Sequence, residues 1–209
     1  MSRLRVKHTT SFTYEAEVQA SYNETRMRPD MSDRQFLLSS QLVITPLSSQ
    51  HQFTDYWGTR VTSIEILTPH QELSIVAESL VEINPRPPVT EGLEWGEIKL
   101  APQASAELTE LLTLTPLTKP PKDVIKGAHK IAAASETPDQ AAREICEWIN
   151  DEMSYVPGVT QVHSSAAEAW KDKQGVCQDI SHITVGALRS AGIPARYVSG
   201  YLHPVDDAE

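Results

Sequence analysis

Hydrophobic and polar positions alternate over the first part of the chain. Between residues 4 and 14 the larger side chains occupy every second position, and a period of two places them on one face of a β-strand. Further strand-like runs cover residues 22–28, 34–45, 50–57, 60–67 and 71–83. Gly58, within DYWGTR, predicts a hairpin turn between two of these runs. Short strands separated by turn residues predict an antiparallel sandwich or barrel.

A proline-rich stretch then breaks this alternation. Pro85, Pro87 and Pro88 favour an extended connector, and we place a domain boundary between about residues 84 and 103. After Gln103 the period becomes helical and predicts helices over residues 104–114, 122–135 and 138–153, the last capped by Thr137. The expected fold class is α+β, with a β-rich domain over residues 1–90, a linker with a short helix over 91–120 and a mainly helical domain over 121–209.

The most informative stretch is GVCQDISHITVGALRSA, residues 175–191, which predicts a buried helix with Cys177 in its first turn. Small or apolar side chains repeat at intervals of three and four, and we expect Cys177 to lead this stripe toward the core. The stripe consists of Cys177, Ile180, Thr184, Ala187, Leu188 and Ala191. A short helix capped by Ser165 should precede it. Residues 195–202 should follow it as a strand that ends at His203, before a frayed acidic tail.

Composition narrows the classes of function. The 209 residues carry a net charge of −10, which argues against nucleic acid as a partner because such binding draws on clustered Lys and Arg. No run approaches the roughly 18 apolar residues of a membrane span, and the first residues lack the apolar region of a signal peptide. Two cysteines make no disulfide framework, so we expect a reduced, cytoplasmic protein, with a single bridge as the alternative. No CxxC or HExxH spacing occurs, and we expect neither a metal nor a cofactor.

The two cysteines have different expected roles. A thiol at a helix N-terminus faces unpaired N–H groups and the helix dipole, which favour the thiolate, so Cys177 can act as a nucleophile. The alternative is a small buried side chain without chemistry, and this stretch alone gives the two interpretations equal weight. Cys146 is assigned to packing because it falls within an inward stripe of the helix that starts at Pro138. That stripe is Ala142, Ile145, Cys146 and Ile149.

A nucleophilic cysteine needs a base within hydrogen-bond reach. His182 follows Cys177 by five residues, about 140° around the helix, so it points to another face and is expected at the surface or in packing. His163 and His203 lie in segments that can fold near Cys177, and the sequence does not choose between them. Asp179 is expected to complement the helix dipole rather than to react.

Several motifs together resemble the bacterial transglutaminase-like superfamily, in particular its cysteine-protease type. In the second half they are EWI (147–149), YVPG (155–158), SSAAEAW (164–170), GVCQD (175–179) and GIPARYVSGY (192–201). In the first half, YNE (22–24), RP (28–29) and DYWG (55–58) are similar to the β-rich N-terminal domain that accompanies this core. The resemblance covers most of the chain.

The resemblance implies a truncated transglutaminase-like, papain-like core in which Cys177 is the nucleophile toward an amide or peptide carbonyl. Tyr155, Trp170 and Gln178 are candidates for lining its cleft, with core packing as the alternative for the two aromatics. The family's histidine and aspartate follow the GIPARYVSGY segment, and no residue here matches them. The chain is therefore expected to be either an inactive piece of a longer enzyme or a short relative that has lost catalysis. A second class of function is a binding module in which the β-rich domain, or the unfinished core, engages a partner chain or a second copy of this chain.

Overall fold

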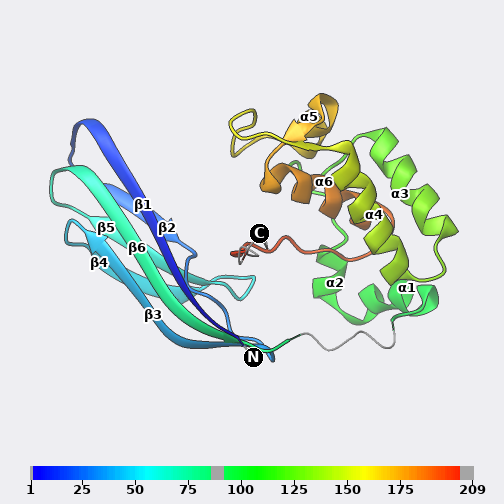
Figure 1. Cartoon of the computed structure of the whole chain (residues 1–209), viewed down its shortest axis with the longest axis horizontal. Helices are drawn as coiled ribbons and strands as arrows, with labels where there is room; N and C mark the ends of the chain where they lie inside the picture. Colours follow the sequence, from blue (N-terminus) through cyan, green and yellow to red (C-terminus); the bar gives the residue numbers. More distant parts are fainter. Residues whose placement is uncertain (1, 86–91, 203–209) are drawn as a thin grey trace, which may run out of the picture. The chain divides into compact units, whose positions relative to one another are not determined.

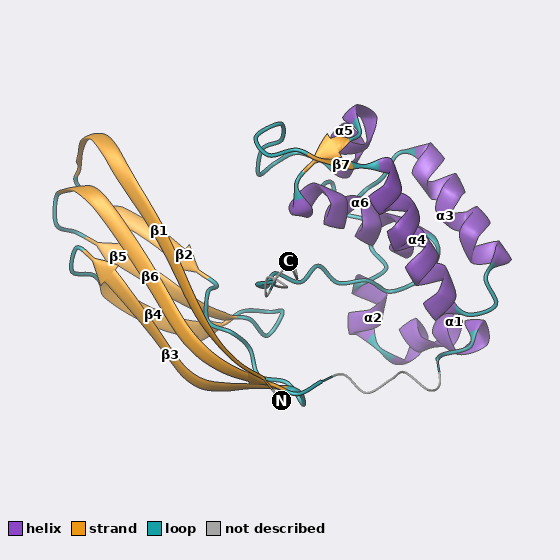
Figure 2. Cartoon of the chain, in the orientation of Figure 1, coloured by secondary structure: helices purple, strands orange, loops and turns teal. Residues whose placement is uncertain are grey.

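The computed structural model describes residues 2–85 and 92–202, and the chain divides into two compact units, Met1–Pro88 and Val89–Glu209. We call these the sheet unit and the helical unit. In the described part of the chain every helix lies in the helical unit, whereas the sheet unit contains only strands and their connections (Figures 1 and 2). Each unit is described by itself.

The sheet unit consists of two antiparallel sheets of three strands each, and the predicted α+β class and sandwich are confirmed. The first sheet has the order β1 (Ser2–Val18), β6 (His70–Ile83), β3 (Gln35–Thr45), and the second has the order β2 (Ser21–Thr25), β5 (Arg60–Ile66), β4 (Ser49–Thr54). Ile64 and Ile66 of β5 pack with Leu73 and Ile75 of β6 in one buried cluster. The two sheets therefore share a core, and they do not close into a barrel.

The pairings within this unit follow the predicted alternation. In β6 alternate residues are buried, and its antiparallel register with β1 runs from Ser2 opposite Ile83 to Thr13 opposite Glu72. The predicted hairpin at Gly58 is confirmed, since β4 and β5 pair across it and this glycine has a φ of +81°. A left-handed φ of this kind favours glycine because a Cβ would be strained there.

A side-chain hydrogen bond between Ser21 and His70 links the two sheets. The His70 ring, on β6, lies with Nε2 at 2.6 Å from the Ser21 hydroxyl, on β2. Its Nδ1 is 2.8 Å from the Thr68 carbonyl oxygen, which can only accept a hydrogen bond. Both ring nitrogens of this buried histidine therefore have partners, and the link ties the edge strand β2 to the opposite sheet.

The helical unit is built around α6 (Cys177–Ser190), which contacts α3 (Lys122–Ala134), α4 (Pro138–Glu152) and α5 (Ala166–Asp172). Ile183 and Ala187 of α6 are fully buried in the main cluster, together with residues of all three neighbouring helices. Two predicted caps are confirmed. The Thr137 hydroxyl accepts from the Gln140 N–H at the start of α4, and Ser165 forms a reciprocal capping box with Glu168 at the start of α5.

The segment over residues 91–120, expected to be a linker with a short helix, contains two helices. They are α1 (Trp95–Ala104) and α2 (Ala106–Glu110), and Ile98 of α1 is buried against Ala141 and Ile193 of the helical unit. The predicted helix over 104–114 overlaps α2, which is shorter, and α1 was not predicted. Pro102 lies in the last turn of α1, where a missing backbone donor interrupts little of the helix.

The strand predicted over residues 195–202 is wrong for the residues that the structure describes. These residues follow α6 as an irregular segment, and the Ala195 N–H donates to the Leu111 carbonyl instead of to a neighbouring strand. Arg189 holds the start of this segment, because its guanidinium donates to the Ala195 and Thr113 carbonyls. A β-prone sequence forms a strand only where another strand supplies its ladder partners. The prolines Pro87 and Pro88, His203 and the acidic tail lie outside the described residues.

Candidate active site

Cys177 is the first residue of α6, and its position is set by a short strand pair. The strands β7 (Ser154–Tyr155) and β8 (Gln174–Gly175) pair in parallel, with Tyr155 opposite Gly175, and the Val156 N–H donates to the Gly175 carbonyl at 2.9 Å. The chain that leaves α4 is thereby fixed beside the residues that lead into α6. Cys177 is exposed and carries a free thiol.

Cys177 does not lead the buried face of α6, so that part of the prediction is wrong. Besides Ile183 and Ala187, the buried residues of the helix include the polar Asp179 and His182 and the small Gly186. The predicted stripe left out these two polar residues, although packing was one expectation for His182, and the stripe was therefore rotated around the helix. Ile180, Leu188 and Ala191, also from the predicted stripe, are only partly buried against the core.

Asp179 fixes the turn on which Cys177 lies. Its Oδ2 accepts a hydrogen bond from the Val176 N–H at 2.8 Å and another from the Thr160 hydroxyl at 2.6 Å. The Gln178 amide donates to the Val162 carbonyl at 3.1 Å. The loop between β7 and α5 is therefore tied to α6 at two points next to the cysteine. The sequence analysis did not find Thr160, and no spacing signal could have found it, because this bond spans 19 positions of the chain.

The start of α6 offers unpaired backbone donors. The first N–H groups of a helix have no acceptor within the helix. Those of Cys177 and Gln178 donate to none of the residues that the structure describes. Such groups, together with the helix dipole, stabilise a negative charge, whether on a thiolate or on the oxyanion of a tetrahedral intermediate.

The histidines do not complete a catalytic pair in the described part of the chain. His182 is buried, and its ring lies 5.5 Å from that of Tyr197. Burial lowers the pKa of His182 below its ordinary value, and the nearby Asp179 carboxylate partly opposes this shift of the pKa. His163 is exposed in the loop that precedes α5. Within residues 92–202 no hydrogen bond joins Cys177 to either ring.

The two aromatic candidates occupy different environments. Tyr155 is 62% exposed and stands opposite Gly175, two residues before the cysteine. Trp170 is 5% exposed, lies in the main core cluster, and donates its indole N–H to the Asp123 carboxylate at 2.7 Å. Tyr155 is thus available at the surface beside the helix start, whereas Trp170 serves the packing of the core.

Cys146 was predicted to lie on the buried face of α4, and this is wrong, because its side chain is exposed. The buried face of α4 is formed by Pro138, Ala141, Ile145 and Ile149. Although the thiol reaches the surface, desolvation by the surrounding protein and the neighbouring Glu147 carboxylate raise its pKa. A raised thiol pKa lowers the thiolate fraction at neutral pH, so Cys146 is a poorer nucleophile than its exposure suggests.

Other kinds of site find little support. Within residues 2–85 and 92–202 no group of three His, Cys, Asp or Glu side chains could hold a metal ion. The helices described are all too short or too polar to cross a membrane.

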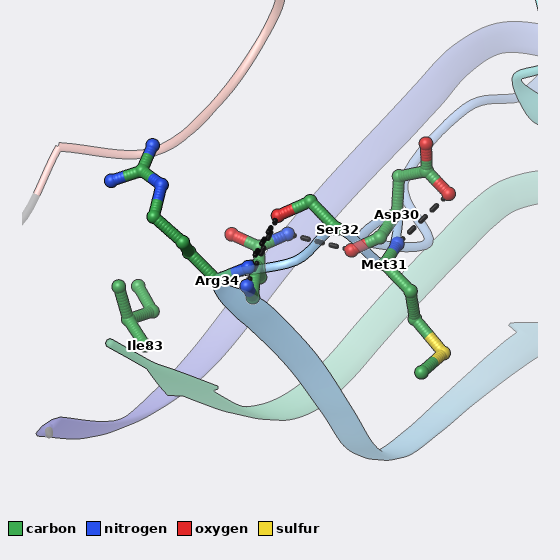
Figure 3. Close-up of a pocket in the computed structure, with 6 residues that line it drawn as sticks. Asp30, Met31, Ser32, Arg34 and Ile83 are labelled. Atoms are coloured by element: carbon green, nitrogen blue, oxygen red, sulfur yellow. Dashed lines mark hydrogen bonds between the residues drawn. The ribbon is translucent and has the colours of Figure 1, made fainter. Parts of the chain in front are cut away.

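A small pocket of about 190 Å³ lies in the sheet unit, beside Ile83 (Figure 3). The polar groups that line this pocket bond to one another within a turn: the Met31 N–H donates to the Asp30 carboxylate, and the Arg34 N–H donates to the Ser32 hydroxyl.

Comparison with known proteins agrees with this architecture. Residues 4–82 match the bacterial transglutaminase-like N-terminal region, and residues 126–208 match the transglutaminase-like superfamily. A crystal structure entitled a "putative cysteine protease", from Cytophaga hutchinsonii, superimposes with a TM-score of 0.73 at 16% identity, over 92% of this chain and 64% of that one. At this identity the similarity shows a common fold.

Mycobacterial proteins are similar over 96% to 100% of the chain. An uncharacterized protein of Mycobacterium leprae is 37% identical over 208 residues, which are 100% of this chain and 74% of that protein. An uncharacterized protein of Mycobacterium tuberculosis is 29% identical over 209 residues, and the chain spans 66% of its length. On the two domain matches and these relatives, the chain belongs to the bacterial transglutaminase-like family.

Proposed function

We propose that the protein is a thiol acyl-transfer enzyme in which Cys177 attacks the carbonyl of a peptide or carboxamide. The observation that carries this proposal is the placement of a free, exposed thiol at the first position of α6, beside backbone N–H groups that have no partner among the described residues. The match of residues 126–208 to the transglutaminase-like superfamily supports the proposal, and Cys177 lies within the matched residues.

The chemistry proceeds in two steps. Sγ of Cys177 attacks the carbonyl carbon, the C–N bond breaks, and the nitrogen leaves as ammonia or an amine with the proton lost by the thiol. Water or an amine then attacks the thioester, and the thiol is regenerated together with an acid or a new amide. The N–H groups at the start of α6 would stabilise the oxyanion in both steps. Proton transfer needs a base, which the resemblance assigns to a histidine after the GIPARYVSGY segment.

The enzymatic test uses protein expressed from the complete reading frame, incubated with a glutamine-containing peptide and a labelled amine. We expect ammonia, together with the hydrolysed peptide or the labelled amide, and no product from the Cys177→Ser variant. Cys146→Ser is the matched control and should retain the activity. If neither ammonia nor labelled product forms, the enzyme proposal is refuted. The ratio of acid to amide distinguishes a hydrolase from a transamidase.

A second candidate, a non-catalytic interaction module, is favoured by one observation. Val198 and Leu202, in the segment after α6, are 78% and 96% exposed. Exposed apolar side chains invite contact with another chain. Light scattering across a range of concentrations tests self-association, which Val198→Asp should weaken. A monomer at all concentrations would contradict self-association, and acyl transfer by the complete protein would contradict the non-catalytic reading.

A further inference from the structure

We propose that Asp179, held by the Thr160 hydroxyl, is the positioning residue of the Cys177 nucleophile. The inference rests on the proposed function, because it names the residue that maintains the geometry of the same site. Asp179 does not itself react. It acts through the backbone of Val176, immediately before Cys177, and through the loop that holds Thr160.

The first argument is the pair of donors that meet at one oxygen. Asp179 Oδ2 accepts from the Val176 N–H, one residue before the cysteine, and from the Thr160 hydroxyl in the loop between β7 and α5. The single carboxylate oxygen therefore fixes the entry of the chain into α6 and the neighbouring loop at the same time. Gln178 ties the same loop from the other side of the cysteine through Val162.

The second argument is the shape of the chain around this carboxylate. A Cβ at Gly175 would lie 2.8 Å from Asp179 Oδ2 and 2.7 Å from Asp179 Cβ, closer than real Cβ contacts. Glycine at this position therefore leaves the space that the carboxylate needs to reach the Val176 N–H. Gly175 and Val176 lie against Asp179, and Gln178 is bonded to the loop. Among residues 175–179 only Cys177 is exposed.

The third argument is that one oxygen of the buried Asp179 carboxylate is left unsatisfied. Asp179 is 1% exposed, and its Oδ1 has no hydrogen-bond partner among the described residues. No Lys or Arg forms an ion pair with it in the same part of the chain. A buried carboxylate with one unsatisfied oxygen costs free energy, and such groups call for an explanation other than stability. Holding a nucleophile in place is such an explanation. An exposed carboxylate would be enough to interact favourably with the helix dipole, so that interaction does not explain why Asp179 is buried.

The decisive variant is Thr160→Val, which keeps the size and charge of the site and removes the hydroxyl that holds the carboxylate. Thr160→Ser retains a hydroxyl and serves as the rescue. Thr184→Val is the matched control, since Thr184 is also half-buried and its hydroxyl donates to the Ile180 carbonyl within α6, away from Asp179. The measurement is the rate of alkylation of Cys177 by iodoacetamide in the native protein, followed by mass spectrometry across neutral to alkaline pH, with Cys146 as internal reference.

We expect Thr160→Val to slow alkylation of Cys177 at neutral pH by about two- to fivefold, the factor that corresponds to a weakened helix-dipole interaction with the thiolate. The rate at alkaline pH, where the thiol is fully ionised, should stay unchanged, so the midpoint of the pH profile moves upward. Thr160→Ser should restore the wild-type profile, and Cys146 should not change in any variant.

An unchanged profile in Thr160→Val, a failure of Thr160→Ser to restore it, or an equal shift in Thr184→Val would overturn the inference. A merely structural role would lower the stability without moving the Cys177 profile. Because alkylation requires no turnover, the outcome is independent of the enzymatic test. A shifted profile in a protein without acyl-transfer activity would leave the positioning role standing and refute only the proposed function.

Discussion

Gly186, in the middle of α6, provides a strong test of how this helix is packed. Glycine is a poor helix former, and replacing it by alanine within a helix ordinarily stabilises a protein by about 1 kcal/mol. Here, however, a Cβ would lie 1.9 Å from the Thr118 carbonyl oxygen and 2.8 Å from Pro120 Cδ. The helix propensity and the packing therefore make opposite predictions for Gly186→Ala.

The packing effect should be the larger one. Overfilling a well-packed site costs about 1–3 kcal/mol, and the upper end applies because the obstructing atom belongs to the backbone. That backbone cannot easily move, since the Thr118 and Lys119 N–H groups donate to the Thr115 carbonyl and the Leu117 carbonyl accepts from the Ala166 N–H. Subtracting the gain in helix propensity leaves a net loss of about 2 kcal/mol.

The assay is urea unfolding followed by far-ultraviolet circular dichroism, which reports mainly on the helical unit. Gly96→Ala in α1 is the matched control, because the added Cβ would meet no described atom within 4 Å beyond its chain neighbours and its own helix backbone. We expect the control to be neutral or slightly stabilising. A Gly186→Ala variant as stable as the control would refute the close approach of α6 to the Thr118 turn, and with it the placement of the helix that carries Cys177.

Three further predictions concern the chemistry of single residues. Cys177 should be alkylated by iodoacetamide faster than Cys146 at neutral pH, because burial and Glu147 raise the pKa of Cys146, and equal rates would contradict the assignment of the nucleophile. The Trp170 indole lowers the pKa of Asp123, so stability should fall as the pH drops below the unfolded value of about 4, and acid titration of Trp170→Phe should show a shallower fall. Burial lowers the pKa of His182, so the native protein should lose stability as the pH falls below about 6.5, and His182→Phe should remove this component from a pH series of melting temperatures.

The elements that the sequence predicts well depend on local signals. Alternation in β1 and β6, the turn at Gly58, and the caps at Thr137 and Ser165 involve residues only a few positions apart. The position of Cys177 at the first turn of its helix was also predictable, because GVCQD begins a clear helical pattern. Local chemistry determines each of these features, and the tertiary structure does not override it.

The features that were missed depend on partners far away in the chain. The burial of Asp179 and His182 depends on partners distant in the chain, since Thr160 and Tyr197 lie against them. The stripe assigned to α6 was rotated for this reason. The segment over residues 195–202 has the composition of a strand, but no strand pairs with it among the described residues. Hydrophobic periodicity does not contain this information, because it records which residues are apolar and not what surrounds them.

The pairing of β1 with β6 affects how the sheet unit folds while it is being synthesised. Ser2 lies opposite Ile83, so the first strand of the unit pairs with the last. At a translation rate of about 5–20 residues per second, roughly 4–16 s separate the synthesis of the two strands. During this interval β1 has no partner on either edge, because β6 is its neighbour in the sheet. A nascent chain arrested before residue 70 should therefore expose a long strand to aggregation and be a preferred client of ribosome-associated chaperones.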